Sequence, residues 1–284
     1  MFYTHSWSRY TSTTALLCAL VTSPALLILT PKTSFAYEQT MTCSNSAGAM
    51  FPCGANESPL PVCWSERSIN YVINSAGSDD LRMDDGSPLS LALEEAVQGA
   101  FAAWTGPECS NISITYNGTT EDNRVGYFKD GKDTNLIIWQ EEWPYADTSA
   151  YALTSVTFSA SDGSISDADI ELNGEFFTWS TKEIPGPNEV DLRNTLTHEI
   201  GHFIGFDHSS LPEATMFASA PLGETSKRTL AEDDLDGVCA VYTPQEESGC
   251  GNCSQSTTGS PTLPWSFLLV LSLLYSQRRK RKHT

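Results

Sequence analysis

Alternating and clustered apolar residues in the middle of the chain predict five β-strands. The clearest is segment 68–74, where apolar and polar side chains alternate with the period of two that a half-buried strand requires. The five predicted strands cover residues 68–74, 112–116, 136–139, 152–158 and 167–172. Residues 174–187 show no such period, and we expect an irregular insertion there.

Three stretches show the helical period instead. The first begins at Ser87 and Pro88, a residue pair typical of a helix start, and ends before Gly106. Its apolar residues recur every three or four positions: Leu89, Leu93, Ala96, Val97, Ala100, Phe101 and Trp104. The other two helices are predicted at residues 189–204 and 230–242. This order of elements predicts one α/β domain, of the α+β type, at residues 67–243.

The two ends of the chain have a different composition. Residues 1–36 combine one arginine, an apolar stretch and small residues at Ser34 and Ala36, which predicts an export signal cleaved after Ala36. A membrane anchor is the alternative, which Pro24 and the short apolar run disfavour. Export into an oxidising compartment also suits the eight cysteines.

The C-terminus consists of a linker with a cysteine motif at Cys250 and Cys253 (residues 244–264), followed by an apolar and basic tail (residues 265–284). The apolar run of 11 residues would rise about 16 Å as a helix, about half of a hydrocarbon core. The arrangement resembles the C-terminal sorting tails of Gram-negative bacterial surface proteins, particularly the myxobacterial type. That resemblance implies recognition of Cys250 by a processing enzyme at the cell surface or outer membrane. A simple membrane anchor is the alternative.

The net charge of −19 is unevenly distributed. All 35 acidic residues, but only nine of the 16 basic ones, lie between Glu38 and Glu247, so this part carries −26. Such a domain repels phosphate backbones, which excludes nucleic acid as a partner. It suits an exported protein, secreted or surface-bound, or one that holds cations, and we expect a monomer.

The cysteines that remain after loss of the signal suggest two disulfides. Cys63 precedes the first strand and Cys109 the second, and a helix joins these strands, so they should be parallel neighbours whose starts share one edge. We therefore predict a Cys63–Cys109 bridge. In the extension at residues 37–66, Cys43 with Cys53 is the next expected pair.

The candidate chemistry lies in the eleven residues from His198 to His208. His198 and His202 are four residues apart and therefore share one face of the predicted helix, with Glu199 beside them. Gly205 can adopt a positive φ and end the helix, so that the chain turns back and brings His208 round as a third ligand. Three histidines with an open fourth position are typical of catalytic zinc. Ordinary surface histidines on a helix are the alternative.

This motif, His-Glu-x-x-His-x-x-Gly-x-x-His, resembles the zinc motif of the metzincin clan of metalloendopeptidases. Segments 207–209, 167–173 and 230–242 are similar to the matrixin branch, and Ala218 departs from astacins and serralysins. The resemblance implies a metzincin-like twisted mixed five-stranded sheet with an active-site helix, a Met-turn at Met216 and a C-terminal helix. It implies zinc-dependent cleavage of peptides that lie along strand 167–173 at the edge of the cleft, with Glu199 as general base.

The sequence also departs from that branch. The two other histidines, His5 and His283, lie in the signal and the tail, so a second, structural zinc lacks ligands and we expect one zinc. The segment around Cys53 lacks the arginine of a zinc-capping pro-segment. Calcium is possible at the acidic residues 79–80, 84–85 and 162–169. A surface adhesion or binding module with a retained metal site, and a metallohydrolase acting on non-peptide substrates, are the alternative functions.

Overall fold

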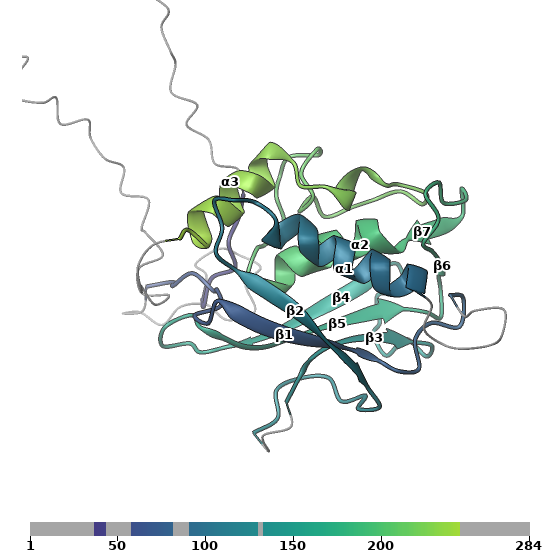
Figure 1. The fold of residues 1–284 in the computed structure, drawn as a ribbon, viewed down its shortest axis with the longest axis horizontal. Helices are drawn as coiled ribbons and strands as arrows, with labels where there is room; N and C mark the ends of the chain where they lie inside the picture. Colours follow the sequence, from purple (N-terminus) through teal and green to yellow (C-terminus); the bar gives the residue numbers. More distant parts are fainter. Residues whose placement is uncertain (1–36, 44–57, 82–90, 130–132, 245–284) are drawn as a thin grey trace, which may run out of the picture. The chain divides into compact units, whose positions relative to one another are not determined.

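A mixed five-stranded sheet forms the centre of the computed structural model, which describes residues 37–43, 58–81, 91–129 and 133–244 (Figure 1). The strand order is β2-β1-β3-β5-β4, with β4 antiparallel and the others parallel. The strands are β1 (Ser68–Asn74), β2 (Ser113–Thr120), β3 (Asn135–Gln140), β4 (Ala152–Phe158) and β5 (Ile165–Asn173). The predicted five-stranded mixed sheet is confirmed.

The edges of the sheet are β2 and β4, and the prediction that residues 167–173 form an edge strand is wrong. β5 lies between β3 and β4, and every residue from Asp167 to Asn173 is buried. The apolar members of β5 point into the core, whereas its acidic members point to the other face. There Asp169 accepts a hydrogen bond from Gly126, in the segment that joins β2 to β3, and Glu171 accepts one from Tyr145, after β3. β4 pairs on one side only and is half-buried. The free edge next to the helices therefore belongs to β4.

Helices α1 (Leu91–Thr105) and α2 (Leu192–Phe203) lie side by side over one face of the sheet (Figure 1). The buried residues of α1 from Leu93 to Trp104 are those of its predicted apolar face. Phe101 meets Phe203 edge-on, with ring centroids 5.7 Å apart, and the Trp104 indole donates a hydrogen bond to the Thr197 carbonyl over 2.7 Å. These contacts fix α2 against the core.

The start of α2 differs from the prediction by three residues. Glu189–Asp191 form a short strand, β7, which pairs with β6 (Thr178–Ser180) inside the expected irregular insertion. Asp191 is extended and its carboxylate accepts a hydrogen bond from the Asn194 amide over 2.7 Å, so it is the N-cap. The helix therefore begins where a capping side chain satisfies its first amides.

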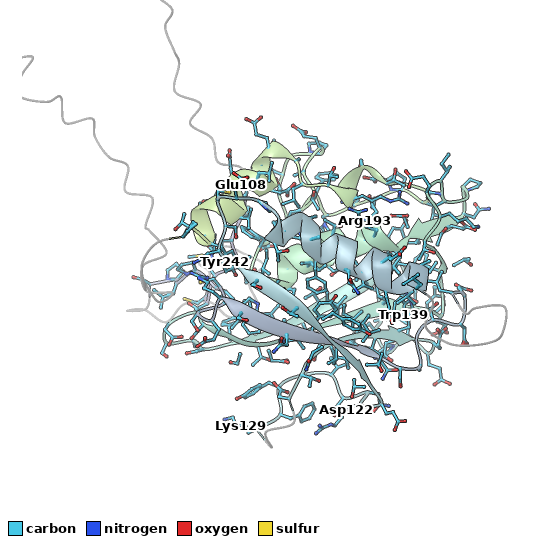
Figure 2. All side chains as sticks on the ribbon, viewed as in Figure 1. Glu108, Asp122, Lys129, Trp139, Arg193 and Tyr242 are labelled. Carbon is cyan, nitrogen blue, oxygen red and sulfur yellow. A yellow bond between two sulfur atoms is a disulfide. The ribbon has the colours of Figure 1, made fainter. Side chains whose placement is uncertain are left out.

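The last elements are η1 (Ser226–Arg228), a short 3₁₀ helix, and α3 (Glu232–Val241). Tyr242 directly follows α3, and its hydroxyl donates to the Ile204 carbonyl at the C-terminal end of α2 over 2.6 Å (Figure 2). The chain's final helix is thus connected to the end of the helix that carries the histidine motif.

The predicted Cys63–Cys109 disulfide is wrong, because Cys109 pairs with Cys239 of α3. The strands that motivated the prediction are parallel neighbours as expected. Cys63, however, is fully buried where its backbone pairs with Gly163 and Ile165 at the start of β5. Cys109 lies instead in the turn after α1, which faces α3.

The remaining predictions concern the two ends of the chain. Cys43 is disulfide-bonded, but its expected partner Cys53 lies outside the described residues. The predicted signal, linker and tail, with Cys250, also lie outside them. Within the described ranges, no helix has the length and apolar character needed to cross a membrane.

Candidate metal and catalytic centre

Helix α2 turns one face to the core and the other to a cleft. Its apolar residues are fully buried: Leu192, Leu196, Ile200 and Phe203, with Ile204 directly after them. His198, Glu199 and His202 lie on the cleft side. Hydrophobic burial of the back of the helix therefore sets the direction of the two imidazoles and the carboxyl group.

Gly205 redirects the chain so that His208 returns to the helix. Its φ of +93° lies in the left-handed region, which glycine adopts without a side-chain clash. A Cβ atom there would also lie 2.2 Å from the Val62 carbonyl oxygen. The Gly205 carbonyl accepts a hydrogen bond from Thr40 over 2.9 Å, which ties the turn to the N-terminal segment.

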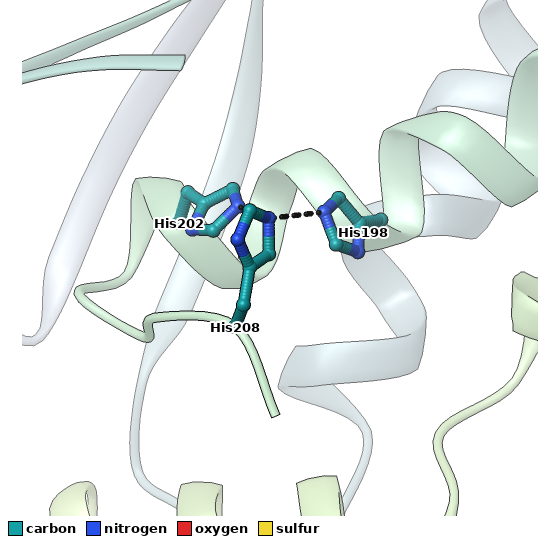
Figure 3. Close-up of side chains that lie close together, drawn as sticks. All are labelled: His198, His202 and His208. Atoms are coloured by element: carbon teal, nitrogen blue, oxygen red, sulfur yellow. Dashed lines mark hydrogen bonds between the residues drawn. The ribbon is translucent and has the colours of Figure 1, made fainter. Parts of the chain in front are cut away.

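The three histidines converge on one point (Figure 3). The His208 Nε2 atom lies 3.3 Å from that of His198 and 3.1 Å from that of His202. One ligand atom from each residue lies within 4.8 Å of the other two, and within the described ranges no other set of histidine, cysteine or acidic side chains meets this criterion.

Backbone carbonyls fix the tautomers of two of these rings. His198 Nδ1 lies 2.7 Å from the Thr215 carbonyl, and His202 Nδ1 lies 2.8 Å from that of Phe206. Because a carbonyl only accepts, each Nδ1 carries the proton and each Nε2 presents a lone pair. Burial lowers the pKa of all three imidazoles, which favours their neutral form. Lone pairs this close repel one another unless a cation lies between them, so the residues fit a zinc ion.

Glu199 is held next to the histidines by the edge strand. The Thr154 hydroxyl of β4 donates to its Oε2 atom over 2.6 Å. Burial raises the pKa of Glu199 to about 7, although the hydrogen bond from Thr154 acts in the opposite direction. A carboxyl group whose pKa lies near neutral pH suits proton transfer. Sequence reasoning missed Thr154, because nothing in strand 152–158 links it to the motif.

Met216 is 3% exposed and packs against Gly201, between the two histidines of α2. The Asp234 carboxylate of α3 accepts hydrogen bonds from the Thr215 amide over 2.7 Å and from the Met216 amide over 3.1 Å. The Thr215 carbonyl is the group that contacts His198, so Asp234 positions that ring indirectly. The sequence signal was the acidic first turn of this helix, which by itself indicated only a favourable helix dipole.

The histidines and Glu199 line a cleft of about 650 Å³. One wall is β4, including Leu153 and Thr154, and the other is the segment 218–220 after Met216. Asn194, Thr195 and Lys227 extend the cleft along α2, away from His202. The unpaired edge of β4 offers backbone groups to an extended peptide.

The acidic residues considered for calcium form no comparable cluster in the described ranges. Asp80 accepts a hydrogen bond from the Trp179 amide, and Asp162 accepts two from Ser164. Asp167 is 1% exposed, and among the described residues neither of its carboxylate oxygens has a hydrogen-bond partner. It lies under the segment between β2 and β3, which carries Asp122 and Lys129 on the side of the sheet away from α1 and α2 (Figure 2). Residues 84–85 lie outside the description.

The sheet, the histidine-bearing helix, the turn at Met216 and the closing helix together define a metzincin-type domain. The family model of the matrixins (peptidase M10) matches residues 64–243, and the chain therefore belongs to the matrixin family.

Several characterised proteins are similar to this chain. Metalloendoproteinase 1 of Glycine max is 29% identical over 172 residues, which cover 59% of this chain and 49% of that protein. Karilysin of Tannerella forsythia is 25% identical over 211 residues, 72% of this chain and 40% of that protein. Neutrophil collagenase of Homo sapiens is 27% identical over 154 residues, 53% of this chain and 28% of that protein. The chain thus spans half or less of the length of these relatives.

Proposed function

We propose that this protein is an exported zinc-dependent endopeptidase. The observation that carries the proposal is the convergence of three neutral imidazoles beside a buried glutamate, next to the unpaired edge of β4. His198, His202 and His208 would hold one zinc ion. When bound, zinc acts as a Lewis acid that lowers the pKa of water and polarises the scissile carbonyl.

The chain's own residues supply positioning and proton transfer. The substrate backbone lies extended along β4, which places the scissile bond near Glu199. Glu199 accepts a proton from the attacking water as general base and delivers it to the leaving amine. Thr154 orients the carboxyl group for both steps, and Met216 forms the apolar floor under the ligands.

Replacing Glu199 with alanine tests this proposal. We expect Glu199→Ala to retain about one zinc per chain and to lose at least about 10²-fold in kcat/KM on a casein-derived peptide, because the base is lost and the ligands stay. Glu95→Ala, an exposed position on α1, is the matched control and should behave as wild type. Activity of Glu199→Ala within about tenfold of wild type would exclude Glu199 as the base.

The same assay with and without a chelator separates the alternative functions. An endopeptidase digests casein or gelatin only with its metal. A surface adhesion or binding module would cleave nothing under either condition, and a non-peptide metallohydrolase would leave both proteins intact while a small ester or amide is hydrolysed. Elemental analysis after dialysis should give about one zinc, and it also tests whether calcium is bound.

We further propose export and removal of the tail. The support is the sequence of residues 1–36 and of residues 244–284, with Cys250 as the cysteine that a processing enzyme recognises. Mass spectrometry of surface protein should find an N-terminus near Tyr37 and no peptide from residues 265–284. Recovery of intact residues 280–284 from mature protein would favour a retained membrane anchor instead.

A further inference from the structure

Lys227 is a buried cation at the cleft. It lies in η1 and is 5% exposed, yet its side chain forms part of the cleft lining. Its ammonium donates hydrogen bonds to the carbonyls of Phe217 and, over 3.0 Å, of Ser219. Its amide donates to Asn194 Oδ1 over 2.7 Å, so the backbone is fixed as well. The ammonium is thus held between α2 and the cleft wall that follows Met216.

The ammonium contacts two carbonyls and the Phe217 ring, whose centroid lies 5.9 Å away, and none of these groups carries a negative charge. A lysine ammonium has three N–H donors and a full charge, and lysine is rarely buried without an ionic partner. Among the described residues no carboxylate forms an ion pair with Lys227, whereas its neighbour Arg228 pairs with Asp191 at 2.5 Å. Burial lowers the pKa of Lys227, opposed by the more distant Glu224, Asp234 and Glu199. A carboxylate that entered the cleft would supply the missing partner.

We propose that Lys227 determines specificity, by binding the carboxylate of an aspartate or glutamate side chain that lies next to the scissile bond of the substrate. The inference rests on the proposed peptidase function. An extended peptide along β4 directs its side chains alternately to either side. One that flanks the bond near Glu199 can enter the part of the cleft lined by Asn194, Thr195 and Lys227.

The surroundings favour an acidic side chain over an apolar or neutral one. Because Lys227 is already largely buried, a carboxylate gains a charge-assisted hydrogen bond to it with little further desolvation of the lysine itself. An apolar side chain of similar size would leave the third N–H donor without a partner. Salt screens the protein's distant negative charges beyond about 8 Å, so the opposing charges are those near Lys227: Glu224, Asp234 and Glu199.

The test uses full-length zinc-loaded protein and three peptides that differ only in one residue: glutamate, glutamine or leucine. The set is made for each of the two positions that flank the bond, and mass spectrometry of the products verifies the cleavage site. At one of these positions, wild type should prefer glutamate over glutamine by about 10- to 100-fold in kcat/KM, as expected for a hydrogen bond to a charged group.

Lys227→Met should abolish this preference while leucine peptides are still cleaved, and Lys227→Arg should retain part of it. Lys182→Met, at an exposed lysine that pairs with Glu189, is the matched control and should leave the ratio unchanged. Because the ratio compares peptides on one enzyme, a general loss from a displaced segment 217–219 cancels.

Two results would overturn the proposal: a wild type that cleaves glutamine peptides as well as glutamate peptides at both positions, or a Lys227→Met variant with an unchanged ratio. If Lys227→Met does not fold, the wild-type ratio alone decides. If wild type cleaves no peptide of any kind, the proposed peptidase function itself has failed.

Discussion

Gly201 lies between the two histidines of α2 and allows the helix to pack directly on Met216. A Cβ atom at this position would lie 2.1 Å from Met216 Sδ and 2.9 Å from Trp104 Cζ2, well inside van der Waals contact. Both neighbours are buried, at 3% and 0% exposure. Alanine should gain about 1 kcal/mol of helix propensity over glycine, whereas overpacking a core costs about 1–3 kcal/mol or more. At these distances the cost of overpacking exceeds the gain in helix propensity. We therefore expect Gly201→Ala to lower the free energy of unfolding by about 1–2 kcal/mol.

Urea denaturation of metal-free protein measures this loss, and zinc content reports on the site. Gly99→Ala in α1 is the matched control, because the new Cβ would meet only the flexible Arg193 side chain, at 3.1 Å (Figure 2). That variant should be unchanged or slightly more stable. In a Met216→Ala background, which removes the nearest clashing atoms, Gly201→Ala should cost at least about 1 kcal/mol less than in wild type. A Gly201→Ala protein as stable as wild type would refute the packing argument.

Two further predictions concern stability. The pKa of Asp167 is raised to about 8 by burial and by the nearby Asp169 and Asp133. The folded protein therefore retains a proton that the unfolded chain loses near pH 4. Because of this difference, the free energy of unfolding falls as pH rises toward 8. Asp167→Asn should therefore raise the free energy of unfolding by about 1–3 kcal/mol at pH 8 and change it little at pH 4. Equal urea midpoints for wild type and Asp167→Asn at pH 8 would contradict this. Replacing Cys109 and Cys239 together by serine should lower the free energy of unfolding by about 2–4 kcal/mol in non-reducing urea titrations, because their disulfide links residues 130 apart. No change would mean that the two cysteines are not bridged in solution.

The elements with a strong local period were predictable from the sequence. β1 and β4 have their predicted bounds, and the apolar face of α1 is the predicted one. The helix and strand boundaries that depend on distant residues were not predictable from the sequence. Asp191 caps α2, and Arg228, 37 positions further on, pairs with its carboxylate. The hydrophobic period of the sequence carries no information about that partner, so it extends the predicted helix to Glu189.

The predictions of the edge strand and of the disulfide were wrong for a related reason. Segment 167–173 alternates acidic and apolar residues, which is typical of a strand with one face in water. Here the acidic face is covered by the segments after β2 and after β3, where Asp169 accepts a hydrogen bond from the Gly126 amide and Glu171 accepts one from the Tyr145 hydroxyl. Alternation therefore predicted the strand but not its neighbours. The position of Cys109 depends likewise on how α3 returns to the domain, and that is a tertiary contact.

The candidate site likewise has a part that was predictable from the sequence and a part that was not. The convergence of His198, His202 and His208 was predictable because a helix turn and one glycine, all within eleven residues, bring them together. The groups that fix the chemistry of those side chains come from elsewhere in the chain: Thr154 from the edge strand and Asp234 from the last helix. A local motif can thus specify which atoms bind a metal. The tautomer of His198 and the orientation of Glu199 depend instead on hydrogen bonds between elements that only the assembled sheet and helices bring into contact.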